Sequence, residues 1–587
     1  MADLGELKVL TFNLWGIFNS KMREARMKQF ASKVDAYDII LLQEQFTQDD
    51  FDLIIQHIPR SVRETRYFRR FPSSFYGSGC AVISRFPIRS SFFHTYPLQG
   101  YPEMVLHGDF FANKGAALIK VDVPITGASG TMRVHEVLLY TTHLVAIYQK
   151  VSELPSWRDE RYLPYRLSQA ISLAEFITNT SKPSDTIIIG GDFNSSQRSL
   201  EVQMLLILLK RRGYTMRSVL PTPSTILETA TSNMERAVAN STYTFSNKNA
   251  FNCCKTSYFK LLNMQSDIPS QIDHVFFNHA HLSLQPFEQC PDADPNYPFY
   301  VTVGEKRVPS GVVVFTENQV RLPPSVPLAR KVALLLESCA GSRRSYLGKN
   351  VRCFTEWLAP HKSREEAEED SDDDELALYP LSDHYGVAAR FVLRAAGNDT
   401  GSPGPDHPLN GDAPTAVSLT EDEVMVVNSV VQFLESFTDK LKQQAGTSRY
   451  LALSCLATLL LHLYVLRNAL DVQRERTAGA LQQLYYMSES GKLLPKVDAE
   501  GQTSSLRRWV VSALRRERGE SSPHPPPDFG LLAEELTLRP RWLSMSTAAV
   551  TNVVLSFTGI ASFGIGMIQR MGNYNVLKEQ VRQLLNT

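Results

Sequence analysis

The stretch DTIIIGGDFN (185–194) joins three consecutive isoleucines to two glycines, an aspartate and an asparagine. The isoleucines predict a buried strand, because β-branched residues favour strands and suit the centre of a sheet. Gly, Asp and Asn are ordinary strand terminators, so a plain turn explains the end of this stretch. An active site at the mouth of a buried sheet explains it as well, with the glycines ending the strand and leaving space for a bound phosphate. The rest of the chain decides between these two interpretations.

The composition indicates a globular chain. At 587 residues it exceeds a single hydrophobic core, so two or more regions are expected. The formal net charge is zero, which argues against a nucleic-acid binder that depends on a global positive field. Seven cysteines without a CxxC pair argue against a disulfide scaffold or a cysteine-ligated zinc site and fit a reducing compartment.

Residues 1–395 are predicted to form one catalytic region in which strands and helices alternate. Apolar residues at three-to-four spacing predict helices over 20–34 and 166–180. Alternating or Ile/Val-rich runs predict half-buried or buried strands. These strands are 7–15, 38–44, 79–88, 115–123, 136–144, 185–194, 271–277 and 384–393.

Two shifts in composition interrupt and end this region. Residues 302–380 look like an insertion. Their acidic block REEAEEDSDDDE (364–375) predicts a solvated, disordered loop rather than a calcium site, since the glycine and spacing of an EF-hand loop are missing. Residues 396–418 form a linker rich in Gly, Pro and Asp. After the linker, Thr420 and Glu423 form a capping box that starts an amphipathic helix.

The helical tail, residues 419–587, contains two long uncharged segments. Segment 542–568 exceeds the roughly 20 apolar residues that a bilayer span needs. Segment 450–466 is shorter, but arginines flank it and can snorkel to the membrane surface. Both are predicted to be transmembrane helices, with two buried core helices of a soluble domain as the alternative. Their orientation is not readable, because the stretch between them exceeds the roughly 60 residues over which flanking charges set topology.

Polar residues fall at or near the ends of the predicted strands. Any one of them has an ordinary explanation: Asn13 as a turn residue, Glu44 as a carboxylate at a helix start, His143 as a satisfied core histidine. The set needs another explanation, because a carboxylate at the end of an apolar strand must be paired, hydrogen-bonded or metal-bound to offset its burial. The set comprises Asn13, Glu44, His143, Asp192, Asn194, Asp273, Asp383 and His384.

The residue types indicate a chemistry. Carboxylate and amide oxygens without cysteines suit a hard cation such as Mg²⁺, which takes one or two carboxylates and keeps waters or substrate oxygens. Histidines with partner aspartates suit general acid–base work, since the aspartate fixes the tautomer and stabilises the imidazolium. Together these groups predict the hydrolysis of a phosphoester by an activated water.

The ordered motifs resemble the endonuclease/exonuclease/phosphatase superfamily. Each triplet alone is common, whereas the ordered set is specific. Within the superfamily, the chain resembles the Mg²⁺-dependent neutral sphingomyelinases and the inositol phosphosphingolipid phospholipases C. Its stretch LQGYPEMVLHGDFFANKGAALI (98–119) is similar to their phosphate-loop-like segment, and a pair of hydrophobic segments follows a linker. The motifs are T-F-N-L-W-G (11–16), L-Q-E (42–44), T-H-L (142–144), G-D-F-N (191–194), I-D-H-V (272–275) and S-D-H (382–384).

The resemblance implies a fold and a set of ligands. The fold is a four-layer α/β sandwich of two mostly antiparallel sheets flanked by helices, followed by a C-terminal helical membrane-anchoring region. Glu44, with help from Asn13, would hold the Mg²⁺ that bridges the scissile phosphate, with Mn²⁺ as the alternative ion. Lys114 and Asn13 would contact the substrate. For Lys114 the other interpretation is an ordinary surface lysine at a strand start.

The resemblance also implies the general base. His384 would take a proton from the attacking water, oriented by Asp273, while Asp383 would support the geometry or the metal. The interval between Asp273 and Asp383 is longer than in close relatives of that family, so the resemblance does not define the rim of the active site.

Three further residues would act on the phosphate. Asp192 and Asn194 would position water and phosphate or stabilise the transition state. Because they are two apart along an extended chain, they would point to the same side. His143 would neutralise phosphate charge and assist the leaving alkoxide.

The leading hypothesis is a membrane-anchored phosphodiesterase of the phospholipase C type that cuts sphingomyelin or inositol phosphosphingolipid to ceramide and a phosphorylated headgroup. The alternatives are an inositol-phosphate phosphatase or nuclease of the same superfamily, and an inactive membrane scaffold. The expected partners are the lipid bilayer and its phosphosphingolipid, with no nucleic acid. The basic stretch LRRWVVSALRRER (506–518) would meet either anionic phospholipid or solvent. We expect an integral protein of an intracellular or plasma membrane with a cytosolic catalytic domain.

Overall fold

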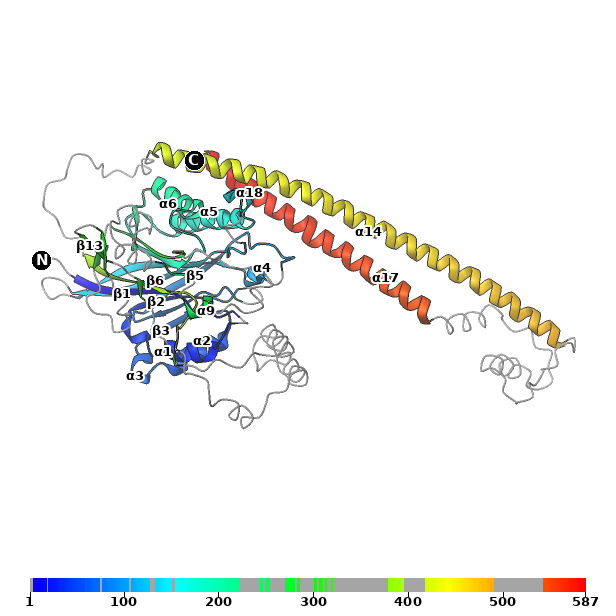
Figure 1. Cartoon of the computed structure of the whole chain (residues 1–587), viewed down its shortest axis with the longest axis horizontal. Coiled ribbons are helices and arrows are strands. Elements are labelled where there is room, and N and C mark those ends of the chain that lie inside the picture. The colour runs from blue at the N-terminus through cyan, green and yellow to red at the C-terminus, as the bar shows by residue number, and fades with distance from the viewer. Residues whose placement is uncertain are drawn as a thin grey trace. The chain divides into compact units, whose positions relative to one another are not determined.

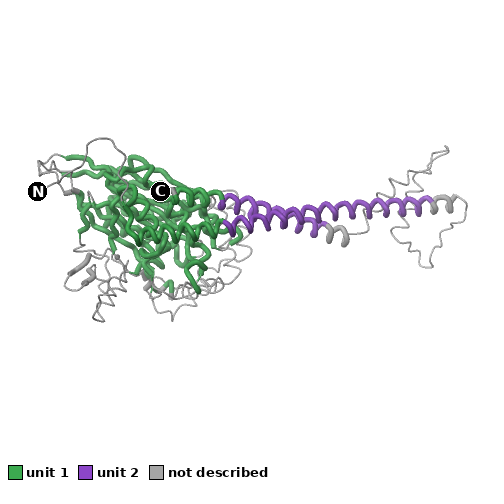
Figure 2. Tube along the Cα trace, turned by 90° about the horizontal axis from the view of Figure 1, so that it is seen from above, with its two compact units in different colours: residues 1–438, 575–587 green, residues 439–574 purple. Residues whose placement is uncertain are grey.

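The chain folds into two compact units, residues 1–438 with 575–587 in one and residues 439–574 in the other (Figure 2). The computed structural model describes residues 4–394 and 418–586, with interruptions of which the longest are 221–242, 254–269, 286–299, 320–377 and 490–541. The predicted acidic block, nearly all of the linker and the basic stretch lie outside the described residues. The domain boundaries proposed from the sequence therefore stay predictions.

The first unit is built on two mixed β-sheets (Figure 1). Within each sheet one neighbouring pair is parallel, β1 with β2 and β7 with β8, and the other paired strands described there are antiparallel. The first sheet has the order β11 (Leu282–Gln285), β17 (Gly386–Arg394), β1 (Leu4–Asn13), β2 (Ile39–Gln43), β4 (Ala81–Ser84), β3 (Tyr67–Arg70), with β14 (Val312–Val313) also on β17. The second has the order β5 (Ile88–Thr95), β6 (Gly115–Thr126), β7 (Met132–His143), β8 (Thr186–Asp192), β10 (Asp273–Asn278), β9 (Met216–Ser218).

Helices cover the outer face of each sheet, which makes four layers (Figure 1). One buried cluster lies between the sheets, a second between the first sheet and its helices, and a third between the second sheet and its helices. The predicted sandwich of two mostly antiparallel sheets is confirmed. The helices on the first sheet are α1 (Arg23–Ala31) and α2 (Gln48–His57), with α3 (Arg60–Arg63) after them, and those on the second are α5 (Leu163–Thr180) and α6 (Leu200–Arg211).

Strand β1 shows why the two sheets are buried on both faces. Leu7 and Val9 belong to the cluster between the sheets, while Leu10 and Phe12 belong to the cluster beneath the helices. Successive side chains of a strand point to opposite faces, so a strand covered on both sides reads as a nearly continuous apolar run. The three isoleucines of β8 follow the same rule.

The two glycines of β8 are interior strand residues. The strand runs through them to Asp192 and is buried along its whole length. A Cβ on Gly191 would overlap the carbonyl of Thr142 on β7, and a Cβ on Gly190 would lie 2.7 Å from Leu41 Cδ1 of the other sheet. The expectation that these glycines end the strand and leave space for phosphate is therefore wrong: they allow strand and sheet to approach closely.

The predicted strand 79–88 is two strands in different sheets. Its first part is β4 of the first sheet and its end opens β5 of the second. The chain turns at Ser84, whose hydroxyl donates to the carbonyl of Phe86 and accepts from its backbone N–H. Pro87 follows, and a proline cannot donate to a sheet ladder.

The tail is helical, as predicted. Its first helix, α14 (Glu421–Glu489), begins at the expected capping box: Glu423 N donates to Thr420 Oγ1 at 3.3 Å and Thr420 N donates to Glu423 Oε2 at 2.9 Å. The described residues contain two helices that are long and apolar enough to cross a membrane. The later elements are α17 (Trp542–Ala561), a π-helical turn η5 (Ser562–Gln569) and α18 (Arg570–Asn586).

We expect Gly191→Ala to loosen the centre of the second sheet more than Gly5→Ala loosens β1. The new Cβ at 191 meets the backbone of a neighbouring strand, which cannot turn aside, whereas at Gly5 it meets the side-chain atom Cγ1 of Ile125 at 3.3 Å. An overpacking cost of about 1–3 kcal/mol would accelerate hydrogen exchange of β7 and β8 amides by roughly 5- to 150-fold. Unchanged exchange in Gly191→Ala would contradict the close approach.

Candidate active site

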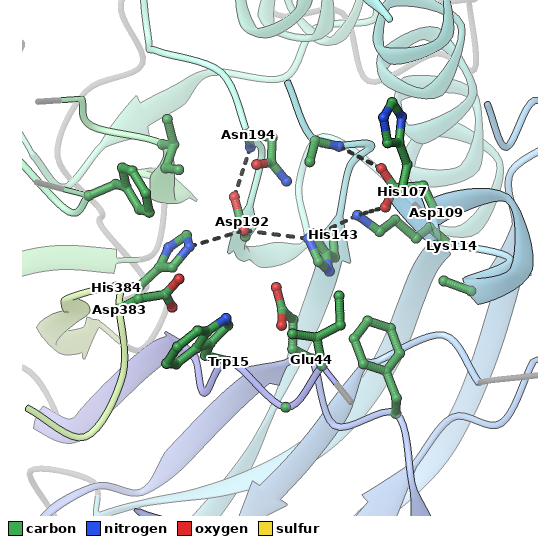
Figure 3. A pocket seen from close by; sticks show the side chains of 18 of the residues that line it. Trp15, Glu44, His107, Asp109, Lys114, His143, Asp192, Asn194, Asp383 and His384 are labelled. Atoms are coloured by element: carbon green, nitrogen blue, oxygen red, sulfur yellow. Dashed lines mark hydrogen bonds and ion pairs between the residues drawn. The ribbon is translucent and has the colours of Figure 1, made fainter. Parts of the chain in front are cut away.

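The polar residues that the sequence places at strand ends meet at one edge of the two sheets (Figure 3). The carboxyl ends of β1 and β2 lie there because the two are parallel, and the same holds for β7 and β8. Strands β10 and β17 run antiparallel to β8 and β1, so their first residues lie at this edge as well. Seven of the nine predicted site residues line the pocket: Glu44, Lys114, His143, Asp192, Asn194, Asp383 and His384.

Glu44 stands on a constrained piece of backbone. Its φ is +60°, in the left-handed region that few residues other than glycine adopt. A Cβ on Gly16 would overlap the Glu44 carbonyl, so the glycine of the N-L-W-G motif lets the two segments touch. Burial raises the pKa of Glu44, opposed by a hydrogen bond from Asn13 Nδ2 to Glu44 Oε1 at 3.1 Å. Its Oε2 is buried without a hydrogen-bond partner within the described part of the chain.

Asp192, Asp273 and His384 form a buried cluster. Asp192 and Asp273 are directly opposite each other on β8 and β10. His384 Nδ1 lies 2.9 Å from Asp273 Oδ2, and its Nε2 lies 4.0 Å from Asp192 Oδ2. Burial raises the pKa of Asp192 to about 6, and the charge of Asp273 adds to this. Burial lowers the pKa of His384, but its neighbouring carboxylates, above all Asp273, outweigh burial and hold that pKa well above its ordinary value.

Two amide side chains brace the cluster. Asn13 is fully buried, and its Nδ2 donates to Asp192 Oδ2 at 2.9 Å as well as to Glu44. Its Oδ1 accepts from Trp15 N at 2.9 Å, which leaves one lone pair for another partner. Asn194 is not in an extended chain: its φ is +49°, and its N–H donates to Asp192 Oδ1 at 2.8 Å. A turn, and not strand alternation, brings Asp192 and Asn194 to one pocket, so the expectation of an extended segment is wrong.

Lys114 is a buried cation and not a surface lysine. It is 2% exposed, and its ammonium group lies 2.6 Å from Asp109 Oδ1, 2.9 Å from the Leu144 carbonyl and 3.0 Å from His143 Nε2. Burial lowers the pKa of His143 well below its ordinary value, and the charges of Lys114 and His384 add to this. His143 is therefore neutral, with Nε2 accepting from the ammonium group, and it also lies 3.5 Å from Asp192 Oδ2.

Asp383 is the other acid of the pocket. Burial raises its pKa to about 6, and the charge of Glu44 adds to this while His384 opposes it. Ser382 Oγ lies 3.3 Å from Asp383 Oδ1 and also donates to the Asn13 carbonyl at 2.6 Å. The S-D-H segment is thereby tied to the end of β1.

Several residues of the pocket lie outside the motifs and were not predicted from the sequence. Asp109, the partner of Lys114, opens the short helix α4 (Asp109–Ala112) inside the segment 98–119, where its five-residue spacing from the lysine was the available signal. His107 stacks on Tyr148 at 4.0 Å between ring centroids, and both line the pocket. The rest of the rim is largely apolar, with Trp15, Ile17, Phe46, Ile147 and Phe245.

Two places in the site could hold a cation: one cluster of three side chains and one carboxylate oxygen. Asp192, Asp273 and His384 each offer one ligand atom, and these atoms lie within 4.8 Å of one another. The imidazole Nδ1 is already engaged with Asp273, so this cluster is better suited to proton transfer. The Oε2 of Glu44 is buried without a hydrogen-bond partner among the described residues, and a hard divalent cation fits such a carboxylate oxygen.

Comparison with known proteins identifies the family. The model of the endonuclease/exonuclease/phosphatase family matches residues 10–310, just over half of the chain. The chain therefore belongs to the endonuclease/exonuclease/phosphatase family, as the ordered motifs predict. The match ends before Asp383 and His384, which the fold brings back to the pocket.

The curated relatives include sphingolipid phosphodiesterases. Sphingomyelin phosphodiesterase 2 of Mus musculus is 34% identical over 199 residues, 33% of this chain and 42% of that protein. Inositol phosphosphingolipids phospholipase C of Schizosaccharomyces pombe is 34% identical over 203 residues, 34% of this chain and 44% of that protein. The chain thus spans less than half the length of these relatives. Among solved structures, sphingomyelinase C from Streptomyces griseocarneus is 14% identical, with a TM-score of 0.35 over 66% of this chain and 99% of that one.

We expect Asp109 and Lys114 to be strongly coupled in stability. Removing one partner of a buried ion pair costs about 3–5 kcal/mol, because the other charge stays buried. Asp109→Asn and Lys114→Met should each lower the urea midpoint, and the double variant should lose less than the sum. Lys28→Met is the control, since its pair with Glu24 is exposed and worth about 0–1 kcal/mol. If the double variant lost as much stability as the two single variants together, the predicted coupling between Asp109 and Lys114 would be wrong.

Proposed function

We propose that the protein is a membrane-anchored, Mg²⁺-dependent phosphodiesterase of the phospholipase C type, hydrolysing sphingomyelin or an inositol phosphosphingolipid to ceramide and a phosphorylated headgroup. The observation that carries the proposal is that His384, held by Asp273, lines one pocket with Glu44 and its unpartnered carboxylate oxygen. The names of the curated relatives support the substrate class.

His384 is the general base in this proposal. The 2.9 Å contact with Asp273 holds the ring through Nδ1 and selects the tautomer whose Nε2 is free to accept a proton. Nε2 takes that proton from the water that attacks phosphorus. Asp192, 4.0 Å from Nε2, then stabilises the imidazolium that forms.

Lys114 and His143 act on the phosphate. In this proposal Lys114 supplies the positive charge, and its ammonium group donates a hydrogen bond to the neutral His143. The pair places positive charge and a polarised imidazole beside Asp192, on the side of the pocket opposite His384 (Figure 3). It attracts the phosphate oxygens and assists the leaving alkoxide. Asn194 completes this wall of the pocket.

Glu44 is the proposed metal ligand. Its Oε2 meets no partner within the described residues, and the Asn13 amide fixes its other oxygen at 3.1 Å. A bound Mg²⁺ would neutralise charge on the phosphate oxygens, and Mn²⁺ offers the same chemistry. Asp383, whose pKa the charge of Glu44 helps to raise, is placed to share or support that ion.

The apolar rim and the tail suit a lipid substrate. Trp15, Phe46 and Phe245 line the same pocket as the charged and polar residues, and this mixed lining matches a charged headgroup attached to an apolar body. Anchoring the protein in the membrane that contains the substrate raises the local concentration of one relative to the other, as linked binding sites do. We therefore propose an integral membrane protein with a cytosolic catalytic unit, in an intracellular or plasma membrane.

The direct test is release of phosphocholine from sphingomyelin in mixed micelles with Mg²⁺, run beside an inositol phosphosphingolipid, an inositol phosphate and DNA. His384→Ala should lower kcat on the lipid by about 10²- to 10⁴-fold, the usual worth of general base catalysis. His279→Ala is the control, since this exposed histidine contacts the carbonyl of Thr215 away from the pocket. Cleavage of DNA or of the inositol phosphate alone would assign a different member of the family. No cleavage by wild type or variant would favour a scaffold.

Glu44→Gln should weaken Mg²⁺ binding at least tenfold in titration calorimetry without substrate. The variant keeps an oxygen for the Asn13 bond but removes the charge that the cation needs. Thermal melting in chelator should not fall, because burial already disfavours the charged form of Glu44. Glu64→Gln, at an exposed ion pair, is the matched control. Wild-type Mg²⁺ affinity in Glu44→Gln would exclude Glu44 as the ligand.

A further inference from the structure

In the second unit, two apolar helices pair along a line of small and polar residues. Helices α14 and α17 lie side by side in both views (Figures 1 and 2). Cys455 Cβ lies 3.3 Å from the position of a Cβ on Gly559, and His462 Nδ1 lies 2.5 Å from Asn552 Oδ1. The pairing is antiparallel, because the earlier residue of one helix meets the later residue of the other.

The contacts recur every seven residues on α14 and on the partner segment, which runs from α17 into η5. On α14 they involve Ser448, Cys455 and His462, and on the partner segment Asn552, Gly559 and Gly566. A Cβ on Gly566 would overlap the Ser448 side chain. Seven-residue spacing keeps one seam of a helix facing its partner, and small residues let two helix backbones come close. We call these six residues the seam.

The large apolar side chains of both helices point away from the seam. Phe557 and Ile560 are 74% and 72% exposed. The most apolar windows of the two helices are only 11% and 6% buried. A soluble protein buries its large apolar side chains and exposes its polar ones, and this unit does the reverse. Other exposed members are Leu451, Leu453, Leu456, Leu460, Leu461, Val465, Val550, Val553, Val554 and Phe563.

We propose that α14 and α17 form a two-helix transmembrane hairpin closed by the seam, with lipid acyl chains covering its outer surface and both ends that join it to the first unit on one side of the membrane. This inference rests on the membrane anchoring proposed above and adds the topology that the sequence leaves open. The uncharged stretches 450–466 and 542–568 supply the length, and the outward apolar surface supplies the contact with lipid.

The path of the chain sets the topology. Residues 575–587 belong to the same compact unit as residues 1–438. Leu577 is fully buried there, and Gln580 Nε2 donates to the Ser168 carbonyl at 3.2 Å. Residues 439–574 therefore leave and re-enter one side of the membrane. Two antiparallel helices between these points give one crossing outward and one crossing back.

The polar pair inside the seam fits this placement. His462 sits within an uncharged segment and its ring is hydrogen-bonded to Asn552. A polar group in hydrocarbon needs a partner inside the protein, and each of these residues satisfies the other. Because one such pair is satisfied only in one alignment of the helices, it fixes their register.

The seam is tested by a disulfide. Gly559→Cys places a second sulfur against the native Cys455, with 3.3 Å between the two Cβ positions, so a small outward shift of the helices reaches the separation of about 3.5–4.5 Å that disulfides use. The full-length protein is reconstituted in phosphatidylcholine vesicles, oxidised, and cut at a protease site inserted after Ser504. Most of the Gly559→Cys chains should keep their two fragments linked without reductant. Ile560→Cys, which faces outward, is the matched control, and equal linkage in both variants would overturn the seam.

The topology is tested with two protease sites in one chain, one after Ser504 and one ahead of Met1. In sealed vesicles each molecule should be cut at only one site, and doubly cut product should appear only after detergent. This readout does not depend on the orientation of insertion. Doubly cut product without detergent, or release of the protein by alkaline carbonate, would overturn the proposal. Release would favour another protein, in place of lipid, as the partner that covers the apolar surface.

The same preparations are assayed on sphingomyelin in mixed micelles, where topology has no influence. Normal turnover with failed protection would overturn the hairpin and leave the proposed function standing. Protection without turnover would overturn the function and leave the hairpin standing.

Discussion

The hydrogen bond from Asn13 to Asp192 joins the two sheets at the candidate active site. Asn13 ends β1 of the first sheet, Asp192 ends β8 of the second, and the 2.9 Å bond between them is buried. The same amide nitrogen also holds Glu44. One side chain thus links the proposed metal ligand of one sheet to the aspartate beside the base of the other. The position of Asp192 in turn depends on Gly190 and Gly191, whose missing side chains let β8 lie close to its neighbours.

Burial and neighbouring charges then push the pKa values of the two histidines of the pocket apart. Both are nearly inaccessible, and burial alone lowers the pKa of an imidazole. His143 faces the ammonium group of Lys114, which adds to that effect, whereas His384 faces carboxylates that reverse it. The pKa values of two groups of the same chemical type are therefore pushed in opposite directions within one pocket, and the higher value belongs to the proposed base. An acid and a base with pKa values pushed apart are what general acid–base chemistry requires.

The sequence predicts the site better than it predicts the local backbone. Residues such as Glu44 and His384 could be found because the limits of strands are readable from apolar runs. Glu44 follows β2, which is parallel to β1, and His384 precedes β17, which is antiparallel to β1, so both lie at one edge. The left-handed turn at Asn194 could not be found, since the residue type permits both that turn and an extended chain. The burial of Lys114 could not be found either, because it depends on Asp109 and on a carbonyl thirty residues away in the sequence.

Given the proposed membrane hairpin, the two units follow one physical rule in two solvents, water and lipid. In the first unit, the strand β8 hides its isoleucines between layers, and its polar end opens on a pocket. In the second, Gly559 and His462 lie inside and Phe557 lies outside. Hydrophobic burial is driven by water, so a surface that meets acyl chains has no reason to hide its large apolar residues. What such a pair of helices must still do is satisfy its polar groups and pack its backbones closely. The seam does both, which is why its residues are small or polar at the positions where those of a soluble helical pair would be large and apolar.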